Sequence, residues 1–391
     1  MSGCVSASRQ RTARTAFADA HPGQVYWRMA FRPLVGHAPL RSRLASAWLD
    51  RRLPASLLFQ GRRGVGKQRL AIWLAQLQLC ERTLPDGLGE PCGACQHCRY
   101  VERGMHPDVH WFFPRPKLRD GDPSPEEVAS DLAEALAERM EHEGLWAAPG
   151  GTENIYISTV RALLHQASLR PAMAKHAVFI VGDGERMGQV EGAEFAANAF
   201  LKLLEEPPPA TTLIMTTSEP GALLPTIRSR VVSVRVPTLP RNDMETFLDD
   251  PVVHRKFGTQ PRAELLARAA GAPGELLLGD SNTAAFAAAR RLLEAALKPG
   301  SPDGTAERAK AAARLGVAGA RGAFTDTLEA LSILLHGRVR ELVTQGREID
   351  ARRAASAMSV IENAKRQARG NVSPQLVGAG LLDGLHSTFR G

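Results

Sequence analysis

The sequence has 391 residues, of which 44% are hydrophobic, so it is long enough to form two or three domains with buried cores. Its formal net charge is +8, but residues 1–52 contain nine arginines against only Asp19 and Asp50 and so contribute +7 of it. The charge therefore marks a basic N-terminal arm rather than a nucleic-acid-binding surface elsewhere, and because no run of eighteen apolar residues occurs, no membrane-spanning helix is expected.

The basic arm comprises residues 1–30 and is rich in arginine, serine, alanine and threonine, without the apolar core of a secretory signal. We expect it to be disordered. A transit peptide has the same composition, and an overextended start or a flexible bacterial leader explains it equally well. Without a secretory signal the expected location is cytoplasmic and reducing, where clustered cysteines serve as ligands more often than as disulfides. Cys4 is assigned no role.

A phosphate-binding loop is predicted next. The apolar spacing predicts a helix over residues 40–49, a short buried strand over 56–59 and a second helix over 69–80. Between that strand and the second helix lies a glycine-rich segment, in which the residues expected to meet a nucleotide are Gly61, Gly64, Gly66, Lys67 and Gln68. Strand, glycine loop and helix in this order are typical of loops that hold phosphate through backbone N–H groups and a lysine.

The residue after Lys67 makes this loop unusual. A working loop places a Ser or Thr hydroxyl there to hold Mg²⁺, whereas this chain has Gln68, whose amide is longer and differently placed. We therefore expect ATP or ADP to bind weakly, if it binds. The alternative is a glycine-rich turn that holds no ligand.

Four cysteines follow with the spacing C-x₁₁-C-x₂-C-x₂-C: Cys80, Cys92, Cys95 and Cys98. Thiolates separated by two-residue gaps lie on one tight turn, which suits tetrahedral Zn²⁺ and fits poorly with the geometry of two separate disulfides. We expect one structural zinc ion in a module spanning residues 80–98. His97 and His106 lie nearby and are able to replace a ligand, and unligated buried thiols are the alternative.

Further along the chain, residues 108–113 are predicted to form a strand, and residues 157–169 a helix. Between them lies an insertion at 114–153. Its stretch 118–145 carries nine acidic residues against two arginines, and we expect an amphipathic helix there. The charged face of this helix serves either solubility alone or the docking of a partner. The segments 178–181 and 212–215 are short and continuously apolar, as in fully buried parallel strands. The fold class is therefore α/β. Alanine- and leucine-rich helices are expected after residue 237.

A second nucleotide element should follow the strand at 178–181, where an acidic residue normally holds Mg²⁺. Gly182 occupies that position and has no side chain to bind a metal, and a glycine is expected to leave the strand end loose. Asp183 or Glu185 is a possible substitute after a shift of register. Gln68 and Gly182 are thus two independent defects, and we expect hydrolysis by this chain to be absent or very slow.

Longer motifs give a specific resemblance. The segments that carry it are Asn198-Ala-Phe-Leu-Lys-Leu-Leu-Glu-Glu-Pro-Pro208, Leu223-Leu-Pro-Thr-Ile-Arg-Ser-Arg-Val231, Ser168-Leu-Arg-Pro171 and His106-Pro-Asp108. Together with the glycine loop and the cysteines, they resemble the bacterial clamp-loader ATPases, the AAA+ subunits of DNA polymerase III, over roughly residues 35–237. The resemblance implies a P-loop core with a parallel sheet at 31–237, a helical lid at 238–297 and a helical collar domain at 298–391. In the lid, the ATP-sensing arginine of active relatives would fall near Gly274, and it is missing.

The departures at Gln68 and Gly182 favour the stator-like delta-prime members of that family. In such a protein Arg230, with Ser229 beside it, would be an arginine finger acting on the ATP of a neighbouring subunit; a surface arginine at a strand end is the alternative. The implied partners are gamma/tau motor subunits, the clamp-opening delta subunit and, through the complex, the sliding clamp and primer-template DNA at the nucleoid. Two other functions remain open: a gamma/tau-type motor, and a zinc-bearing nucleic-acid-binding protein outside replication.

Overall fold

The computed structural model describes residues 30–82, 89–119, 121–142, 144–146, 153–188, 193–277, 279–298, 302–317, 321–369 and 373–390. The N-terminal arm and Cys4 therefore lie outside the described residues, apart from Ala30. The body of the molecule is a five-stranded parallel sheet in the order β2-β3-β4-β1-β5. Its strands are β1 (Ser56–Gln60), β2 (Val109–Phe112), β3 (Ala177–Val181), β4 (Thr211–Thr217) and β5 (Val232–Arg235). The mixed α/β class is confirmed.

The central strands explain why this sheet could be predicted. Every residue of β3 and β4 is buried, as expected for parallel strands that are covered by helices on both faces. The edge strand β5 was not identified from the sequence, because it has only four residues and none of them is fully buried. It pairs with β1 in parallel, with Leu57 opposite Val232.

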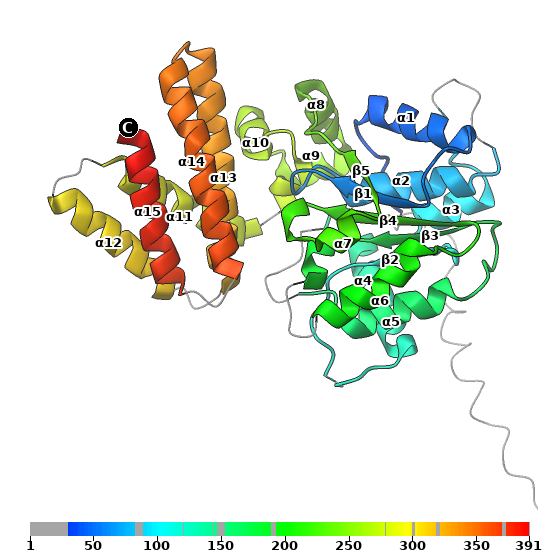
Figure 1. Cartoon of the computed structure of the whole chain (residues 1–391). Coiled ribbons are helices and arrows are strands. Elements are labelled where there is room, and N and C mark those ends of the chain that lie inside the picture. The colour runs from blue at the N-terminus through cyan, green and yellow to red at the C-terminus, as the bar shows by residue number, and fades with distance from the viewer. Residues whose placement is uncertain are drawn as a thin grey trace, which may run out of the picture.

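Helices cover the sheet and complete the main hydrophobic core (Figure 1). They are α1 (Ala38–Leu49), α2 (Lys67–Leu79), α3 (Gln96–Glu102), α4 (Pro125–Glu141), α5 (Ile157–Ala167), α6 (Ala193–Glu205) and α7 (Pro225–Arg228). Predicted helices at 40–49, 69–80 and 157–169 correspond to α1, α2 and α5. Side chains of α2 are buried along almost its whole length, which places the end of the glycine loop firmly against the sheet.

The acidic insertion forms the predicted amphipathic helix, α4. Ser124 and Glu127 begin it with a reciprocal pair of side-chain to backbone hydrogen bonds, a capping box. Its apolar side joins the main core through Val128, Leu132, Ala135 and Met140. The Arg115 guanidinium holds Asp131 of this helix at 2.8 Å. The insertion is therefore anchored to the core rather than free of it.

Two further helical groups follow the sheet. The first packs around its own apolar cluster and contains α8 (Arg241–Asp249), α9 (Pro251–Phe257) and α10 (Arg262–Ala269). The second, gathered at one end of the molecule in Figure 1, contains α11 (Gly279–Leu297), α12 (Pro302–Val317), α13 (Arg321–Thr344), α14 (Glu348–Arg369) and α15 (Pro374–Arg390). The predicted lid at 238–297 includes α11, but this helix packs with the second group. We therefore propose a boundary between lid and collar near residue 278.

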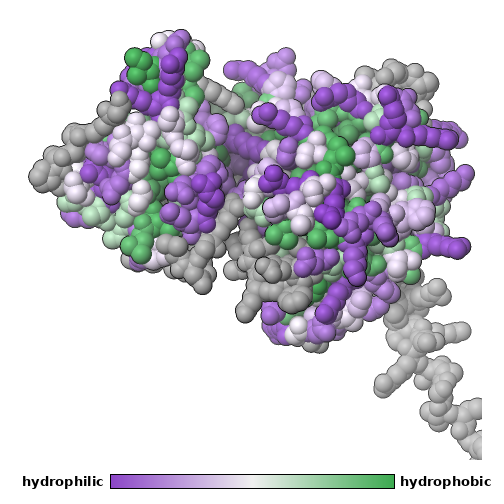
Figure 2. Space-filling model, in the orientation of Figure 1, coloured by the Kyte–Doolittle hydropathy of each residue, from purple (hydrophilic) through white to green (hydrophobic). Residues whose placement is uncertain are grey.

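The surface seen in Figure 2 is mainly hydrophilic, with apolar residues scattered between charged side chains. In the part of the chain that the structure describes, no helix is both long enough and apolar enough to cross a membrane.

Candidate nucleotide, metal and arginine sites

The glycine loop has the geometry that the sequence predicts. It leaves β1 at Gly61 and enters α2 at Lys67. Gly64 and Gly66 have φ angles of 77° and 93°, a left-handed conformation that side chains rarely tolerate. At Gly61 a Cβ atom would lie 2.3 Å from the carbonyl oxygen of Val236, so only glycine fits there.

The Lys67 ammonium is already satisfied by the chain itself. Nζ donates to the carbonyl oxygens of Gly61 and Arg62, both at 2.9 Å, and to the Ser218 hydroxyl at 2.8 Å. Burial lowers the pKa of Lys67, and the nearby Asp183 and Glu185 carboxylates oppose that effect. A phosphate group would have to replace contacts that the lysine now makes with the loop.

Gln68 and Gly182 touch each other, which corrects the interpretation of two independent defects. A Cβ atom on Gly182 would lie 2.8 Å from each of the three terminal atoms of the Gln68 side chain. The Gln68 amide therefore fills the space above the glycine, and its Nε2 donates to Asp183 Oδ2 at 2.8 Å. The expectation of a loose strand end is also wrong, because the Gly182 N–H donates to the Phe112 carbonyl oxygen at 2.7 Å.

The two carboxylates considered as substitutes for Gly182 are engaged elsewhere. Asp183 accepts the Gln68 amide and has a left-handed backbone, with φ of 50°. Glu185 is buried and accepts the Ser218 N–H at 3.0 Å. Burial raises the pKa of Glu185, and the neighbouring Asp183 raises it further. Each carboxylate thus has a contact within the chain, but Glu185 Oε2 and Gln68 Oε1 are buried without a hydrogen-bond partner among the described residues.

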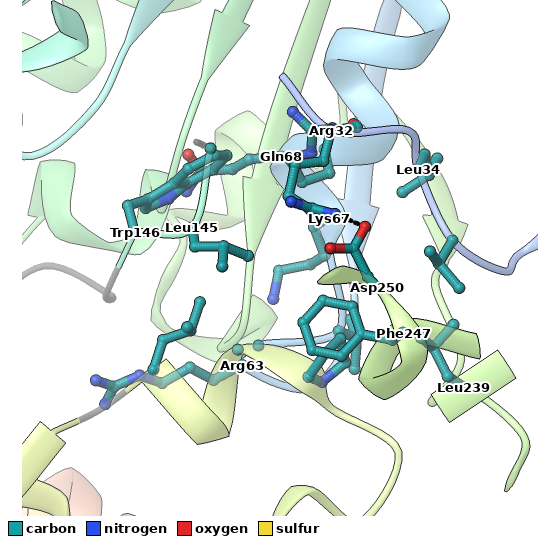
Figure 3. A pocket seen from close by; sticks show the side chains of 18 of the residues that line it. Arg32, Leu34, Arg63, Lys67, Gln68, Leu145, Trp146, Leu239, Phe247 and Asp250 are labelled. Carbon is teal, nitrogen blue, oxygen red and sulfur yellow. Dashed lines mark hydrogen bonds and ion pairs between the residues drawn. The ribbon is translucent and has the colours of Figure 1, made fainter. Parts of the chain in front are cut away.

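A pocket of about 150 Å³ lies beside the loop and is lined by residues from three regions (Figure 3). The core contributes Arg32, Leu34 and Lys67, the lid contributes Leu239 and Phe247, and the end of the insertion contributes Leu145 and Trp146. Arg32 forms an ion pair with Asp250 of the lid, seen as the dashed line in Figure 3. Apolar walls beside a glycine loop and a lysine are suited to a base and its phosphates.

The lid also touches the loop backbone. Gly274 donates its N–H to the Gly64 carbonyl oxygen at 2.9 Å, and a Cβ atom on Gly274 would lie 2.7 Å from the Gly64 Cα. Gly274, near which the ATP-sensing arginine was expected, thus has no room for a side chain in this arrangement.

The four cysteines come together as predicted. Their sulfur atoms all lie within 4.8 Å of one another, and all four thiols are free of disulfides. Cys80 Sγ accepts the N–H groups of Arg82 and Cys92, each at 3.3 Å. Burial raises the pKa of the Cys80 thiol, and these backbone bonds oppose that effect. Four thiolates around zinc at about 2.3 Å would be separated by about 3.8 Å, close to the 3.9 Å between Cys92 and Cys98. The cluster therefore fits a metal with a closed shell of sulfur ligands.

The two histidines near this cluster are not among its ligands. His97 Nδ1 and His106 Nε2 share a hydrogen bond of 2.7 Å, and burial lowers the pKa of His106 to about 4. Behind them Asp108 is buried and accepts three backbone N–H groups, from Ala172, Met173 and Ala174, at 2.5 to 2.9 Å. The His-Pro-Asp motif therefore ties the end of the cysteine module to the loop that leads into β3.

Arg230 lies on the surface two residues after the end of α7, with its side chain 34% exposed. Its Nε donates to Glu205 Oε1 at 2.6 Å, and its Nη1 donates to the Thr226 carbonyl oxygen at 3.0 Å. Ser229 accepts a longer bond from Nη1 at 3.3 Å and donates its hydroxyl to the same carbonyl at 3.0 Å. Contacts with α6 and α7 therefore hold the Ser-Arg pair at the edge of the core.

Sequence reasoning missed the groups that close the pocket. Arg32 and Asp250 are far apart in the chain, and neither belongs to a recognisable motif, so no sequence signal pointed to their pairing. Glu205 was available, because it lies in the Leu-Glu-Glu-Pro segment, but its contact with Arg230 required the structure.

Comparison with known proteins gives a family for this geometry. The family described as DNA polymerase III, delta subunit, matches residues 36–240, which is more than half of the chain. The chain is 28% identical to the delta-prime subunit of DNA polymerase III from Bacillus subtilis over 179 residues, covering 46% of this chain and 41% of that protein. It is 28% identical to the Escherichia coli delta-prime subunit over 227 residues, covering 58% and 55%.

A tau subunit is similar to about the same degree. The chain is 26% identical to the tau subunit of Escherichia coli DNA polymerase III over 246 residues, covering 62% of this chain and 31% of that protein. In all three comparisons the match therefore spans between about a third and just over half of the relative's own length.

Proposed function

The chain belongs to the DNA polymerase III delta subunit family, and from that premise we propose that it is a delta-prime, stator-like subunit of a clamp loader. In this role it joins gamma/tau motor subunits and a clamp-opening delta subunit, and the assembly loads the sliding clamp onto primed DNA at the expense of ATP hydrolysed by the motors. The family assignment argues against the alternative of a nucleic-acid-binding protein outside replication.

The contact between Gln68 and Gly182 is the observation that carries the proposal. Gln68 and Gly182 occupy the two positions where a working site holds Mg²⁺, and neither is the usual ligand. The Gln68 amide fills the space beside Gly182. At the same time Arg230 remains on the surface, held by groups of its own chain. A subunit that has lost its own metal site and kept a surface arginine is suited to act on a neighbour's nucleotide.

Arg230 would supply charge to that neighbour. Phosphoryl transfer develops negative charge on the transferred group, and a guanidinium in trans stabilises it, with a rate effect of about 10³ to 10⁵ in known cases. Arg230 needs no proton transfer for this task. Its scaffold of Glu205, Ser229 and the Thr226 carbonyl limits the orientations of the guanidinium plane.

The remaining parts have supporting roles in the proposal. Zinc held by Cys80, Cys92, Cys95 and Cys98 would be structural, because four sulfurs leave no open position for catalysis. The core at 31–237, the lid that begins at 238 and the helical collar that follows it would place Arg230 at a subunit boundary. ATP or ADP, if bound beside Lys67, would stay weakly bound and unhydrolysed.

A gamma/tau-type motor is the second candidate, because the tau subunit resembles the chain as closely as the delta-prime subunits do. A motor would hydrolyse ATP by itself, and Lys67→Ala would abolish that activity. The absence of Mg²⁺ ligands at Gln68 and Gly182 is the structural argument against it.

Reconstitution tests the proposal. The full chain, purified with its native partners, should appear by mass spectrometry with motor and clamp-opening subunits. Arg230→Ala should assemble normally but lower the clamp- and DNA-stimulated ATPase of the complex, partially, because only one of several sites loses its arginine. Arg228→Ala, an exposed neighbour, is the control and should have little effect. Normal ATPase and clamp loading with Arg230→Ala would refute the arginine-finger role.

A further inference from the structure

Glu205 is the residue that restrains Arg230 most closely. It is the last residue of α6, and its Oε1 accepts Arg230 Nε at 2.6 Å and lies 2.5 Å from Nη2. Nη1 is occupied on the other side by the Thr226 carbonyl and the Ser229 hydroxyl. A guanidinium carries five N–H groups, so these four contacts leave at least one for a further acceptor.

The carboxylate occupies one particular edge of the guanidinium. Glu205 binds the edge formed by Nε and one N–H of Nη2. The terminal edge, formed by Nη1 and the other N–H of Nη2, is then the one able to meet an anion end-on. The contact to Ser229 is the longest of those that Nη1 makes, at 3.3 Å against 3.0 Å, and is therefore the easiest to exchange. An incoming phosphate oxygen can replace it while Glu205 keeps its hold.

Stability does not account for this pair. The side chains of Arg230 and Glu205 are 34% and 46% exposed, and ion pairs this open to solvent contribute little to folding. Orientation is a different matter, because a free arginine samples many rotamers, and a group that must meet a transition state benefits from being held in place beforehand.

We propose that Glu205 is a positioning residue for the arginine finger: it fixes the Nε edge of Arg230 so that the terminal edge faces the phosphate of the neighbouring subunit. This inference rests on the proposed function of Arg230. It assigns no contact between Glu205 and the nucleotide, and it predicts that Glu205 matters only while Arg230 is present.

The test uses the complex reconstituted from full-length chains. ATPase activity with clamp and primed DNA is measured for Glu205→Ala, Glu205→Gln, Arg230→Ala, the double variant Glu205→Ala/Arg230→Ala, and Glu206→Ala as a matched control. Glu206 is the next carboxylate in the chain and is also exposed. Thermal unfolding and co-purification establish that each variant folds and assembles.

Glu205→Ala should lower kcat about 2- to 5-fold, or to the level of Arg230→Ala if that variant loses less, with the KM for ATP unchanged. Glu205→Gln keeps an oxygen that can accept from Nε and should recover part of the loss. The double variant should equal Arg230→Ala alone, because Glu205 acts through that side chain. Glu206→Ala should match the unmodified complex.

The outcomes separate the two ideas. If Arg230→Ala lowers kcat but Glu205→Ala does not, the positioning role is wrong and the finger stands. If Glu205→Ala raises kcat, Glu205 holds the arginine back rather than positioning it, which also overturns the inference. An additive loss in the double variant would show that Glu205 acts by another route. No effect of Arg230→Ala removes the finger itself and with it the role of Glu205.

Discussion

Replacing Gly182 with alanine should destabilise the core through one identifiable collision. The new Cβ would lie 2.8 Å from the Cδ, Nε2 and Oε1 atoms of Gln68, closer than non-bonded atoms approach in folded proteins. The Gln68 amide would have to rotate away and lose its 2.8 Å hydrogen bond to the Asp183 carboxylate. The backbone itself accepts the change, because Gly182 does not have a left-handed φ angle.

The expected loss follows from that bond and the crowding. A hydrogen bond to a charged group contributes about 1.5 to 3 kcal/mol, and an extra methyl in a packed site costs about 1 to 3 kcal/mol, part of which the flexible amide relieves by moving. We expect Gly182→Ala to lower the free energy of unfolding by about 2 kcal/mol. For a core of this size that corresponds to a fall in Tm of about 4 to 8 °C.

The assay is thermal and urea unfolding followed by circular dichroism, in a double-mutant cycle. Gly182→Ala should cost much less in a Gln68→Ala background, since the colliding atoms are gone, with a coupling of at least about 1 kcal/mol. Gly221→Ala is the control, because a Cβ there meets no atom within 4 Å. Equal losses in the two backgrounds, or no loss from Gly182→Ala, would show that the two residues do not pack together.

Three other expectations can be measured on the isolated protein. Metal analysis should give about one zinc per chain, and Cys95→Ser should release it; a metal-free protein that stays folded would contradict the zinc site. ATP turnover should not exceed background, and a rate near 1 s⁻¹ that Lys67→Ala abolishes would revive the motor candidate. Burial alone would raise the pKa of Asp108, but three backbone N–H bonds hold this pKa below the ordinary value of 3.8. The contribution of Asp108 to the stability of the fold is therefore present above about pH 4 and is lost as the pH falls through the folded pKa. Asp108→Asn should therefore lower Tm at pH 7 and flatten its fall between pH 5 and pH 2, and an unchanged acid profile would refute that role.

Much of the core could be predicted because its signals are local. Continuous apolar runs predicted β3 and β4, and the glycine loop required the turn that the structure shows. The cysteine cluster was equally readable, since its members lie within nineteen residues of one another. Strand β5 escaped notice because a four-residue strand at a sheet edge carries too short a pattern.

Contacts between distant segments account for the rest. Gln68 and Gly182 were each recognised as departures from the family pattern. Nothing in the sequence shows that the Gln68 side chain fills the space that a side chain at position 182 would occupy. The pairing of Arg32 with Asp250 and the packing of α11 with the collar helices arise in the same way, from tertiary geometry. Periodicity predicts a helix, and it does not say which neighbouring helix will cover it.

The end of the insertion packs against both the lid and the core, so these parts cannot be exchanged independently of one another. Leu145 belongs to the apolar cluster of the lid, whereas Trp146 packs edge to face on Trp111 and Phe31 of the core. A variant with a shortened insertion would lose the Leu145 side chain from the apolar cluster of the lid and the Trp146 ring from the core. A chimera that exchanges lids between relatives would need to carry this pair of residues along as part of the graft.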